Sequence, residues 1–373
     1  MHVEVESQTP RVLFVSNPSG FSGAEESLCQ MVLHLDRRRY SPVALISLEG
    51  YFARRLREAG VEVVVRGDSF GESTTDNVLY VASVVKKLQP AIVHSNSVNG
   101  IATSAAAALQ RIPLVQHVRN GVIAPYSDSM KWAAAVVVIS EFLRREILRF
   151  DLDPSQVHLI PDEVDLDYFR PGLFNKADVR REFGIPEEAT VAVMIARLAT
   201  NKRHDLILKA GPLIKGAIRS FHLLLKGELY GDSESYSSWH EQLRYSGLGQ
   251  SVTWVPFVPD IRAVHTAADV LILCSDREGL GRCVVEAMAM ELPVIVTNSG
   301  RAQEIVSGGY SGFVVESGNA EALAATVIEA LGNPGLCRRY AGAARQYVER
   351  HLTAQAAASK MAEIYDRILS CQR

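Results

Sequence analysis

Two carboxylates separated by seven residues, Glu278 and Glu286, are the feature of this sequence with the clearest chemical potential. An apolar run from Asp269 to Cys274 predicts a buried strand before them, and the Ala- and Met-rich stretch after them predicts a helix. The glycines of Gly279-Leu280-Gly281 would let the backbone approach a ligand, and the first helical amides would face an anion. Because carboxylates accept hydrogen bonds from paired hydroxyls, a sugar and a ribose are natural ligands. The alternative is an ordinary strand–turn–helix, in which Glu286 only favours the first helical turn.

A second loop supplies positive charge. It follows a predicted strand, Val191–Ile195, opens a helix, and contains Arg197 and Lys202. Two cations beside a helix N-terminus would bind a diphosphate and stabilise it as it leaves a sugar carbon. A pair of surface cations without a ligand is the alternative. A further glycine loop at a strand end, around Gly227, is suited to close backbone approach.

Composition limits the classes of function. The 373 residues suffice for two domains, and 47% apolar and 22% charged residues are typical of a soluble globular protein. The net charge of −3 argues against nucleic-acid binding, and the basic clusters, each flanked by acids, do not indicate contact with a membrane surface. Five cysteines without C-x-x-C spacing, no apolar run of membrane-spanning length and an acidic N-terminus predict reduced thiols and a cytoplasmic protein.

Short apolar strands alternate with helical stretches along the whole chain. This alternation predicts right-handed βαβ units and parallel sheets with helices on both faces. Two predicted strands of the first half end in histidine, His94 and His117, and a glycine-rich loop with Gly20 and Gly23 follows the first strand. A histidine at a strand end would project into the ligand crevice of such a sheet. A purely structural role is the alternative for each. The Pro-bounded, acidic residues 160–171 predict a linker between two domains.

In this order the pieces closely resemble the retaining glycosyltransferases of family 4, which have the GT-B fold. The matching features are Arg197-x4-Lys202, the turn at Gly227, Glu278-x7-Glu286, Leu292-Pro293-Val294 and Gly312-Phe313-Val314, within about residues 190–335. The first half is similar more loosely, through Ser22-Gly23-Ala24-Glu25, Ile139-Ser140-Glu141 and residues 160–165.

The resemblance implies an α/β fold of the GT-B type. Two doubly wound Rossmann-like domains would face each other across a cleft, and the last helix would cross back to the first domain. The expected N-terminal, acceptor-side domain spans residues 1–165 together with 354–373. The expected donor-binding domain spans residues 166–353.

Residue roles follow from the same resemblance. Lys202 and Arg197 would bind the donor diphosphate, Glu278 the sugar hydroxyls and Glu286 the ribose, and His117 would lie beside the transferred sugar. The implied catalytic residues are His117, Arg197, Lys202 and Glu278, and the implied donor-binding residues are Gly23, Gly227, Gly279, Leu280, Gly281 and Glu286.

The implied function is transfer of a sugar from a nucleotide-diphosphate sugar, with a UDP-sugar as the first expectation, to an acceptor hydroxyl with retention of configuration. Such a reaction belongs to glycan, glycoconjugate or secondary-metabolite biosynthesis. Saccharide, glycolipid and small-molecule acceptors all remain open. The rivals are a GT-B sugar-nucleotide epimerase or phosphorylase, and a non-catalytic nucleotide-sugar-binding subunit.

No cofactor and no essential metal are expected. Two Asp-x-Asp motifs, Asp151-x-Asp153 and Asp165-x-Asp167, match the motif with which metal-dependent sugar transferases bind a divalent ion. Neither motif follows a buried strand end in the second half, so both are expected to be turn or cap acids. One departure from the family concerns the predicted linker. Members commonly have Asn-Gly where this chain has Asp162-Glu163, so the conformation or a contact there is expected to differ.

Overall fold

The computed structural model divides the chain into two compact units. Unit 1 comprises Met1–Glu163 and Ala354–Arg373, and unit 2 comprises Val164–Thr353. The structure describes residues 9–16, 23–68, 74–96, 100–119, 127–229, 233–276, 278–298 and 301–371. Gly20 and Ser22 of the glycine-rich first loop lie outside the described residues.

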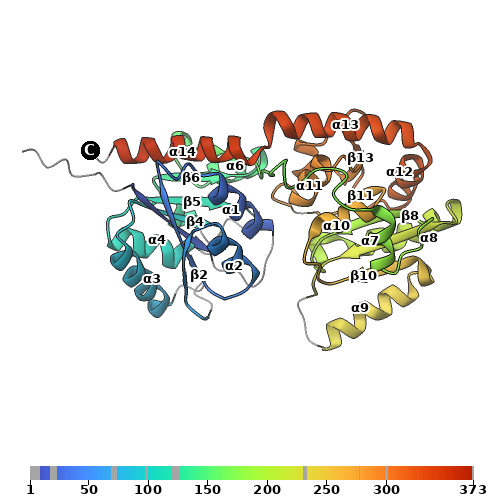
Figure 1. The fold of residues 1–373 in the computed structure, drawn as a ribbon, viewed down its shortest axis with the longest axis horizontal. Helices are drawn as coiled ribbons and strands as arrows, with labels where there is room; N and C mark the ends of the chain where they lie inside the picture. Colours follow the sequence, from blue (N-terminus) through green and yellow to red (C-terminus); the bar gives the residue numbers. More distant parts are fainter. Residues whose placement is uncertain are drawn as a thin grey trace, which may run out of the picture. The chain divides into compact units, whose positions relative to one another are not determined.

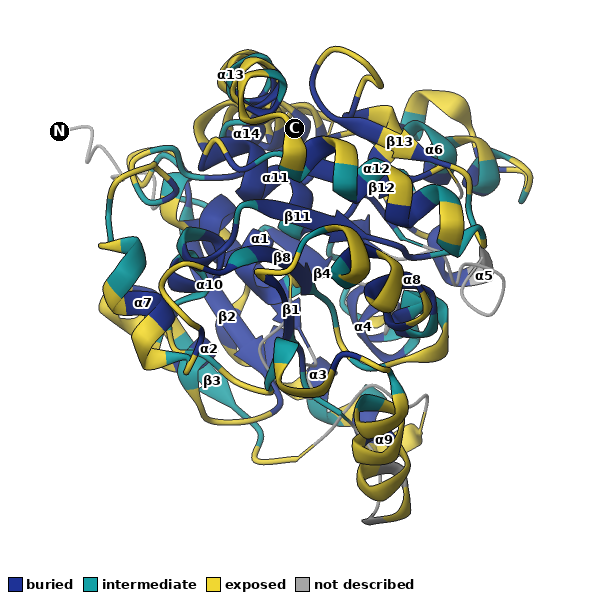
Figure 2. Ribbon diagram, turned by 90° about the vertical axis from the view of Figure 1, so that its right-hand side faces the viewer, coloured by how far each residue is buried: buried dark blue, intermediate teal, exposed yellow. Residues whose placement is uncertain are grey.

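Unit 1 is built on a parallel sheet whose described part has seven strands. In sheet order they are β3 (Glu62–Val65), β2 (Ser41–Ile46), β1 (Arg11–Ser16), β4 (Ile92–Asn96), β5 (Leu114–Val118), β6 (Ala135–Val138) and β7 (Val157–Leu159). Continuous apolar strands such as β6 are buried on both faces, as expected when helices cover both sides of a parallel sheet. Figure 2 shows β1, β2 and β4 coloured almost wholly as buried.

The helices of unit 1 alternate with its strands. They are α1 (Gly23–His34), α2 (Tyr51–Glu58), α3 (Thr75–Leu88), α4 (Gly100–Leu109), α5 (Ser127–Met130) and α6 (Glu141–Leu148), with a short 3-10 turn, η2 (Pro154–Gln156). The last helix of the chain, α14 (Ala354–Ser370), also belongs to this unit and packs against α1 (Figure 1). Met361 and Tyr365 of α14 are fully buried in the same core as Phe14 of β1. The expected return of the last helix to the first domain is therefore present.

Unit 2 repeats this architecture. Its sheet is also parallel, with the described strands in the order β10 (Val252–Val255), β9 (Phe221–Lys226), β8 (Thr190–Ile195), β11 (Val270–Leu273), β12 (Val294–Thr297) and β13 (Phe313–Val315). Its helices are α7 (Lys176–Glu182), α8 (His204–Ala217), α9 (Ser233–Tyr245), α10 (Ile261–Ala267), α11 (Arg282–Ala289), α12 (Ala320–Gly332) and α13 (Pro334–His351), with 3-10 turns η3 (Thr200–Lys202), η4 (Gly249–Ser251) and η5 (Arg301–Glu304). Within the described residues, no helix is both long and apolar enough to cross a membrane.

The carboxylate of Asp269 attaches α7 to the sheet of unit 2. It accepts hydrogen bonds from the Val191 amide at 2.7 Å, from Arg180 at 2.9 Å and from Lys176 at 2.5 Å. Arg180 also donates to the carbonyl of Ala267 at 2.9 Å, and it is buried. A buried cation is stable only when its partners stay in place. Asp269 therefore holds α7 in its position against the sheet.

We expect the Asp269→Ala variant to lose about 3 kcal/mol in the free energy of unfolding, because it leaves the Arg180 charge buried without its carboxylate. Denaturant titration of the purified protein measures this loss. The control is Asp178→Ala, which removes an exposed ion pair with Arg181 on the same helix and should cost less than about 0.5 kcal/mol. Equal losses in the two variants would contradict the role given to Asp269.

Candidate functional site

Lys202 and Glu278 come from two neighbouring strands of unit 2. Lys202 ends η3, in the loop after β8, and Glu278 lies in the loop after β11, which is paired with β8 in parallel. Parallel strands end at the same edge of a sheet, so both loops meet there. The Lys202 ammonium forms an ion pair with Glu278 Oε1, and the Ser275 hydroxyl donates to the same oxygen at 3.0 Å. The structure thus brings together Lys202 and Glu278, the oppositely charged residues that the sequence analysis predicted for one binding site.

Backbone and side-chain contacts hold these two loops against each other. The Asp276 amide donates to the Asn201 carbonyl at 2.9 Å. Arg203, in the left-handed conformation at φ 58°, donates to Asp276 at 3.2 Å and to Asp205 at 2.9 Å. These hydrogen bonds raise the pKa of Arg203, with the bond to Asp205 contributing most. The relative placement of Lys202 and Glu278 is therefore fixed by groups that need no ligand.

Glu286 lies within α11 and is buried. Its carboxylate accepts from Arg282 Nε at 2.9 Å and contacts His265 Nε2 at 3.3 Å. Burial by itself would raise the pKa of Glu286, but the hydrogen bond from His265 and the positive charge of Arg282 outweigh burial and lower it. The carboxylate is therefore held as an anion. Its predicted contact with a ribose remains a prediction.

A further basic residue at this edge was not singled out from the sequence. Lys226 ends β9, next to β8, and it is half-buried. Burial lowers the pKa of its ammonium group, and the negative charges of Glu228 and Glu286 oppose that shift. Its position directly after a predicted strand, Phe221–Leu225, was the available signal.

Gly227 is required by the backbone that it packs against. A Cβ atom at this position would lie 1.8 Å from the carbonyl oxygen of Ala196, the residue before Arg197. The amide of Leu198 donates to the Glu228 carbonyl at 2.9 Å, so the loop that carries Arg197 lies directly on the Gly227 loop. Arg197 itself is exposed. Packing within the fold therefore explains why this position is a glycine. The contact of Gly227 with a donor stays a prediction.

The turn Gly279-Leu280-Gly281 leads into α11. Gly281 has φ 94°, which favours glycine, and a Cβ there would lie 2.8 Å from Leu273. Among the described residues no side chain caps the N-terminus of α11 at Gly281. The contact of these amides with an anionic ligand stays a prediction.

In unit 1, His117 is buried near the carboxyl end of β5 and lies beside His94 and Arg119. The prediction that a strand ends at His94 is wrong, because β4 continues to Asn96. His117 Nδ1 is 3.3 Å from His94 Nε2 and 3.4 Å from Arg119 Nη2. Burial, together with the positive charge of Arg119, holds the pKa of His117 well below its usual value. Arg119, two residues on, was missed in the sequence. The predicted residue Gly23 is exposed and begins α1.

Asp162 explains the departure at the predicted linker. Arg119 donates to its Oδ1 at 2.7 Å, and the Ser27 hydroxyl donates to the same oxygen at 2.9 Å. Arg119 and Asp162 form a buried ion pair, which an asparagine would not provide. Neither Asp162 nor Glu163 has a positive φ, so the strain that a glycine would relieve is absent at this pair.

The two Asp-x-Asp sequences bind backbone amides, as expected of turn and cap acids. Asp153 accepts from the Ser155 amide at 2.8 Å, and Asp165 accepts from the Asp167 amide at 2.8 Å. Within the described residues no group of three or more His, Cys, Asp or Glu side chains is placed to hold a metal ion. Metal independence itself stays an expectation.

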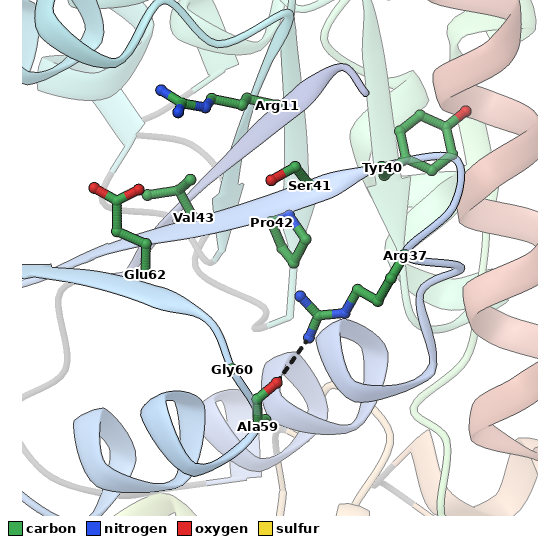
Figure 3. Close-up of a pocket in the computed structure, with 9 residues that line it drawn as sticks. All are labelled: Arg11, Arg37, Tyr40, Ser41, Pro42, Val43, Ala59, Gly60 and Glu62. Carbon is green, nitrogen blue, oxygen red and sulfur yellow. Dashed lines mark hydrogen bonds between the residues drawn. The ribbon is translucent and has the colours of Figure 1, made fainter. Parts of the chain in front are cut away.

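A hollow of about 320 Å³ lies in unit 1 at the amino ends of its strands. Figure 3 shows the residues that line it. The hollow is lined by the first residues of three strands, Arg11 of β1, Ser41 of β2 and Glu62 of β3. Arg37 donates to the Ala59 carbonyl at 3.4 Å there. The candidate residues lie at carboxyl ends of strands, so this hollow is separate from them.

Family models match most of the chain in two segments. A model described as glycosyl transferases group 1 matches residues 175–347, and a model described as glycosyltransferase family 4 matches residues 21–168. Among curated proteins, the D-inositol 3-phosphate glycosyltransferase of Segniliparus rotundus is 30% identical over 184 residues, which cover 49% of this chain and 40% of that protein. The GDP-mannose-dependent alpha-(1-6)-phosphatidylinositol monomannoside mannosyltransferase of Mycobacterium tuberculosis is 28% identical over 238 residues, covering 61% and 60%. The chain thus spans about half the length of the curated relatives that it matches.

Solved structures have the same fold. Anabaena HepE, in complex with UDP-glucose, has a TM-score of 0.85 at 20% identity and covers 96% of this chain and 100% of its own. A glycosyltransferase from Rickettsia africae has a TM-score of 0.83 at 23% identity, covering 97% and 99%. With the two parallel, helix-covered sheets, these likenesses show the two-domain, Rossmann-like GT-B fold.

We expect the Gly227→Ala variant to be destabilised by about 3 kcal/mol or more, because the added methyl group collides with a backbone carbonyl that cannot move independently. Thermal and denaturant unfolding measure the loss. Gly216→Ala, in the last turn of α8 where nothing lies within 4 Å of the added Cβ, is the control and should be neutral or stabilising by about 0.5–1 kcal/mol. Unfolding at the wild-type midpoint in Gly227→Ala would rule out the contact with Ala196 as the reason for this glycine.

We expect the free energy of unfolding to decrease as the pH is lowered below about 6.5. The reason is that burial, aided by the Arg119 charge, lowers the pKa of His94 from 6.5 to about 3 in the folded protein. Between these values the unfolded chain binds a proton that the folded ring does not, so the free energy of unfolding decreases as pH decreases. The slope for one ring approaches about 1.4 kcal/mol per pH unit. Denaturant titrations from pH 7 to pH 4.5 should give a slope that is smaller by this amount in His94→Asn. An unchanged slope would show that the folded ring takes up its proton near pH 6.5.

Proposed function

We propose that this chain, which belongs to glycosyltransferase family 4 and has the GT-B fold, transfers a sugar from a nucleotide-diphosphate sugar to an acceptor hydroxyl. The observation that carries the proposal is the contact between Lys202 and Glu278 at the carboxyl edge of the unit 2 sheet. A cation for a diphosphate and an anion for hydroxyls are adjacent there, with the buried anion of Glu286 on the following helix. These are the charges that the two ends of such a donor require.

The ion pair also suggests how the site accommodates its substrate. Without a donor, each charge is partly neutralised by the other, which reduces the cost of keeping both mostly buried. An arriving diphosphate supplies Lys202 with a second anion, and the sugar hydroxyls supply Glu278 with new donors. Arg197, on the same loop as Lys202, adds a second positive charge for the diphosphate.

The proposed reaction retains the anomeric configuration. The bond between the anomeric carbon and the diphosphate oxygen breaks, and the diphosphate leaves toward Lys202 and Arg197. The acceptor oxygen forms the new bond on the face that the diphosphate has left, and its proton passes to a diphosphate oxygen. Glu278 binds sugar hydroxyls in this scheme and forms no bond to the anomeric carbon. NMR assignment of the anomeric proton in donor and product tests retention directly.

A UDP-sugar is the proposed donor. HepE, which shares the fold, was solved with UDP-glucose, whereas the mycobacterial relative is GDP-mannose-dependent by name. A thermal-shift and turnover screen against UDP-, GDP-, ADP- and dTDP-sugars decides between the bases. Stabilisation by a GDP-sugar alone would replace the uridine donor while leaving the proposed class of reaction intact.

The rival functions give different products. An epimerase converts a nucleotide sugar without an acceptor, so incubation with donor alone yields a second nucleotide sugar. A phosphorylase requires inorganic phosphate, and a non-catalytic subunit binds the donor without turnover. Glycoside formation that depends on an added hydroxyl acceptor excludes all three.

We expect Lys202→Ala to reduce kcat/KM for sugar transfer by about 10²–10³, because it removes a cation from the leaving diphosphate. Steady-state kinetics with the donor identified in the screen provide the measurement. Lys209→Ala is the control, since this lysine lies on the following helix α8 and is exposed, and its kcat/KM should stay within about twofold of wild type. Full activity in Glu278→Ala would disprove the assignment of the site.

A further inference from the structure

Five buried polar groups in unit 1 form a connected chain with His117 at its centre. The Tyr365 hydroxyl, on α14, lies 2.7 Å from His94 Nδ1. His94 Nε2 lies 3.3 Å from His117 Nδ1, and Arg119 Nη2 lies 3.4 Å from the same Nδ1. Arg119 is held in turn by Asp162 at 2.7 Å. All five side chains are buried.

The charge of Arg119 decides the direction of every hydrogen bond in this chain. A guanidinium group only donates, so His117 Nδ1 must be an acceptor; a proton on that nitrogen would point at a cation. His94 Nε2 therefore carries a proton and donates it to His117 Nδ1. His94 Nδ1 is then an acceptor, and the Tyr365 hydroxyl donates to it. The distances of 3.3 and 3.4 Å at His117 Nδ1 exceed the usual value, as expected when two donors share one lone pair.

The surroundings keep the two histidines and Tyr365 neutral. Burial, and then the Arg119 charge, lower the pKa of His94 to about 3 and that of His117 well below its usual value. Burial also raises the pKa of Tyr365 well above its ordinary value. At neutral pH each imidazole thus has one proton, and the hydrogen bonds above place it. Within the described residues, the remaining nitrogen of His117, Nε2, has no hydrogen-bond partner.

We propose that Arg119 and Tyr365, the latter acting through His94, are positioning residues that hold His117 in the tautomer with its proton on Nε2. This inference rests on the proposed function in one respect, the contact between His117 and the transferred sugar. It adds that His117 donates a hydrogen bond to a sugar or phosphate oxygen and does not act as a general base. It also gives the last helix a role in the site, because α14 supplies the first donor of the chain.

Long-range ¹H–¹⁵N NMR of protein labelled at histidine tests the tautomer without any substrate. The His117 signals are assigned by their loss in His117→Gln. We expect Nε2 to show the shift of a protonated nitrogen and Nδ1 that of an unprotonated acceptor in the wild-type protein. A His117 ring protonated on Nδ1, or one that exchanges evenly between both forms, overturns the proposal.

Tyr365→Phe tests the contribution of α14, with Tyr40→Phe as the matched control. Both tyrosines are buried at the interface of α14 with the rest of unit 1, but the Tyr40 hydroxyl bonds Asp366 and the Ala362 carbonyl, outside the histidine chain. In Tyr365→Phe we expect a second His94 tautomer in the spectrum and a kcat about tenfold lower, with a smaller change in the donor KM. Tyr40→Phe should leave the ring signals unchanged and kcat within about twofold. Identical spectra and kinetics in the two variants would reduce Tyr365 to a structural role.

The two kinds of experiment separate this inference from the proposed function. The ring spectrum needs neither donor nor acceptor, so it decides the tautomer even if no sugar transfer is found. A protonated Nε2 in a protein that neither binds nor converts nucleotide sugars would leave the positioning chain valid and disprove the glycosyltransferase activity. Sugar transfer by a protein whose His117 is protonated on Nδ1 would support the glycosyltransferase activity and disprove the positioning chain.

Discussion

Both sheets pair their strands in parallel, and this one constraint determines where the chemistry of the molecule can occur. All strands of such a sheet end at the same edge, so residues from distant parts of the sequence become neighbours there. Lys202 and Glu278 meet because β8 and β11 are adjacent, although β9 and β10 separate them in the chain. His94 and His117 also meet because their strands, β4 and β5, are adjacent, although His94 lies in the middle of β4 and His117 near the end of β5.

The two units use this edge differently. In unit 2 the oppositely charged groups neutralise each other across two loops, and these loops are held by their own backbone contacts. In unit 1 the buried cation Arg119 donates instead to the carboxylate of Asp162, the side-chain oxygen of Asn96 and the imidazole of His117. The cation thereby sets the direction of the hydrogen bonds that its neighbours make. The first arrangement is suited to binding a charged ligand. The second is suited to presenting one ring nitrogen in a defined state.

Much of this was accessible from the sequence, for physical reasons. Apolar strands alternating with helices identify a parallel architecture, and β5 and β11 lie within one or two residues of the positions predicted for them. Strand ends identify Lys202, Glu278 and His117 as candidates, because an open sheet binds ligands at that edge. Partners could not be found in this way. Ser275 contacts Glu278 and Arg282 contacts Glu286, and in each pair the two residues are close in the sequence. The contact of Tyr365 with His94 instead joins residues 271 positions apart, and no periodicity encodes such a pair.

Unit 1 is discontinuous in the sequence, and this has a consequence for biosynthesis. Its core includes Met361 and Tyr365, which leave the ribosome after the whole of unit 2. Unit 1 therefore exposes apolar surface on α1 until α14 is made, which happens after the whole of unit 2 has been synthesised. The segment translated first thus cannot become native before α14, which is translated after unit 2, has been made.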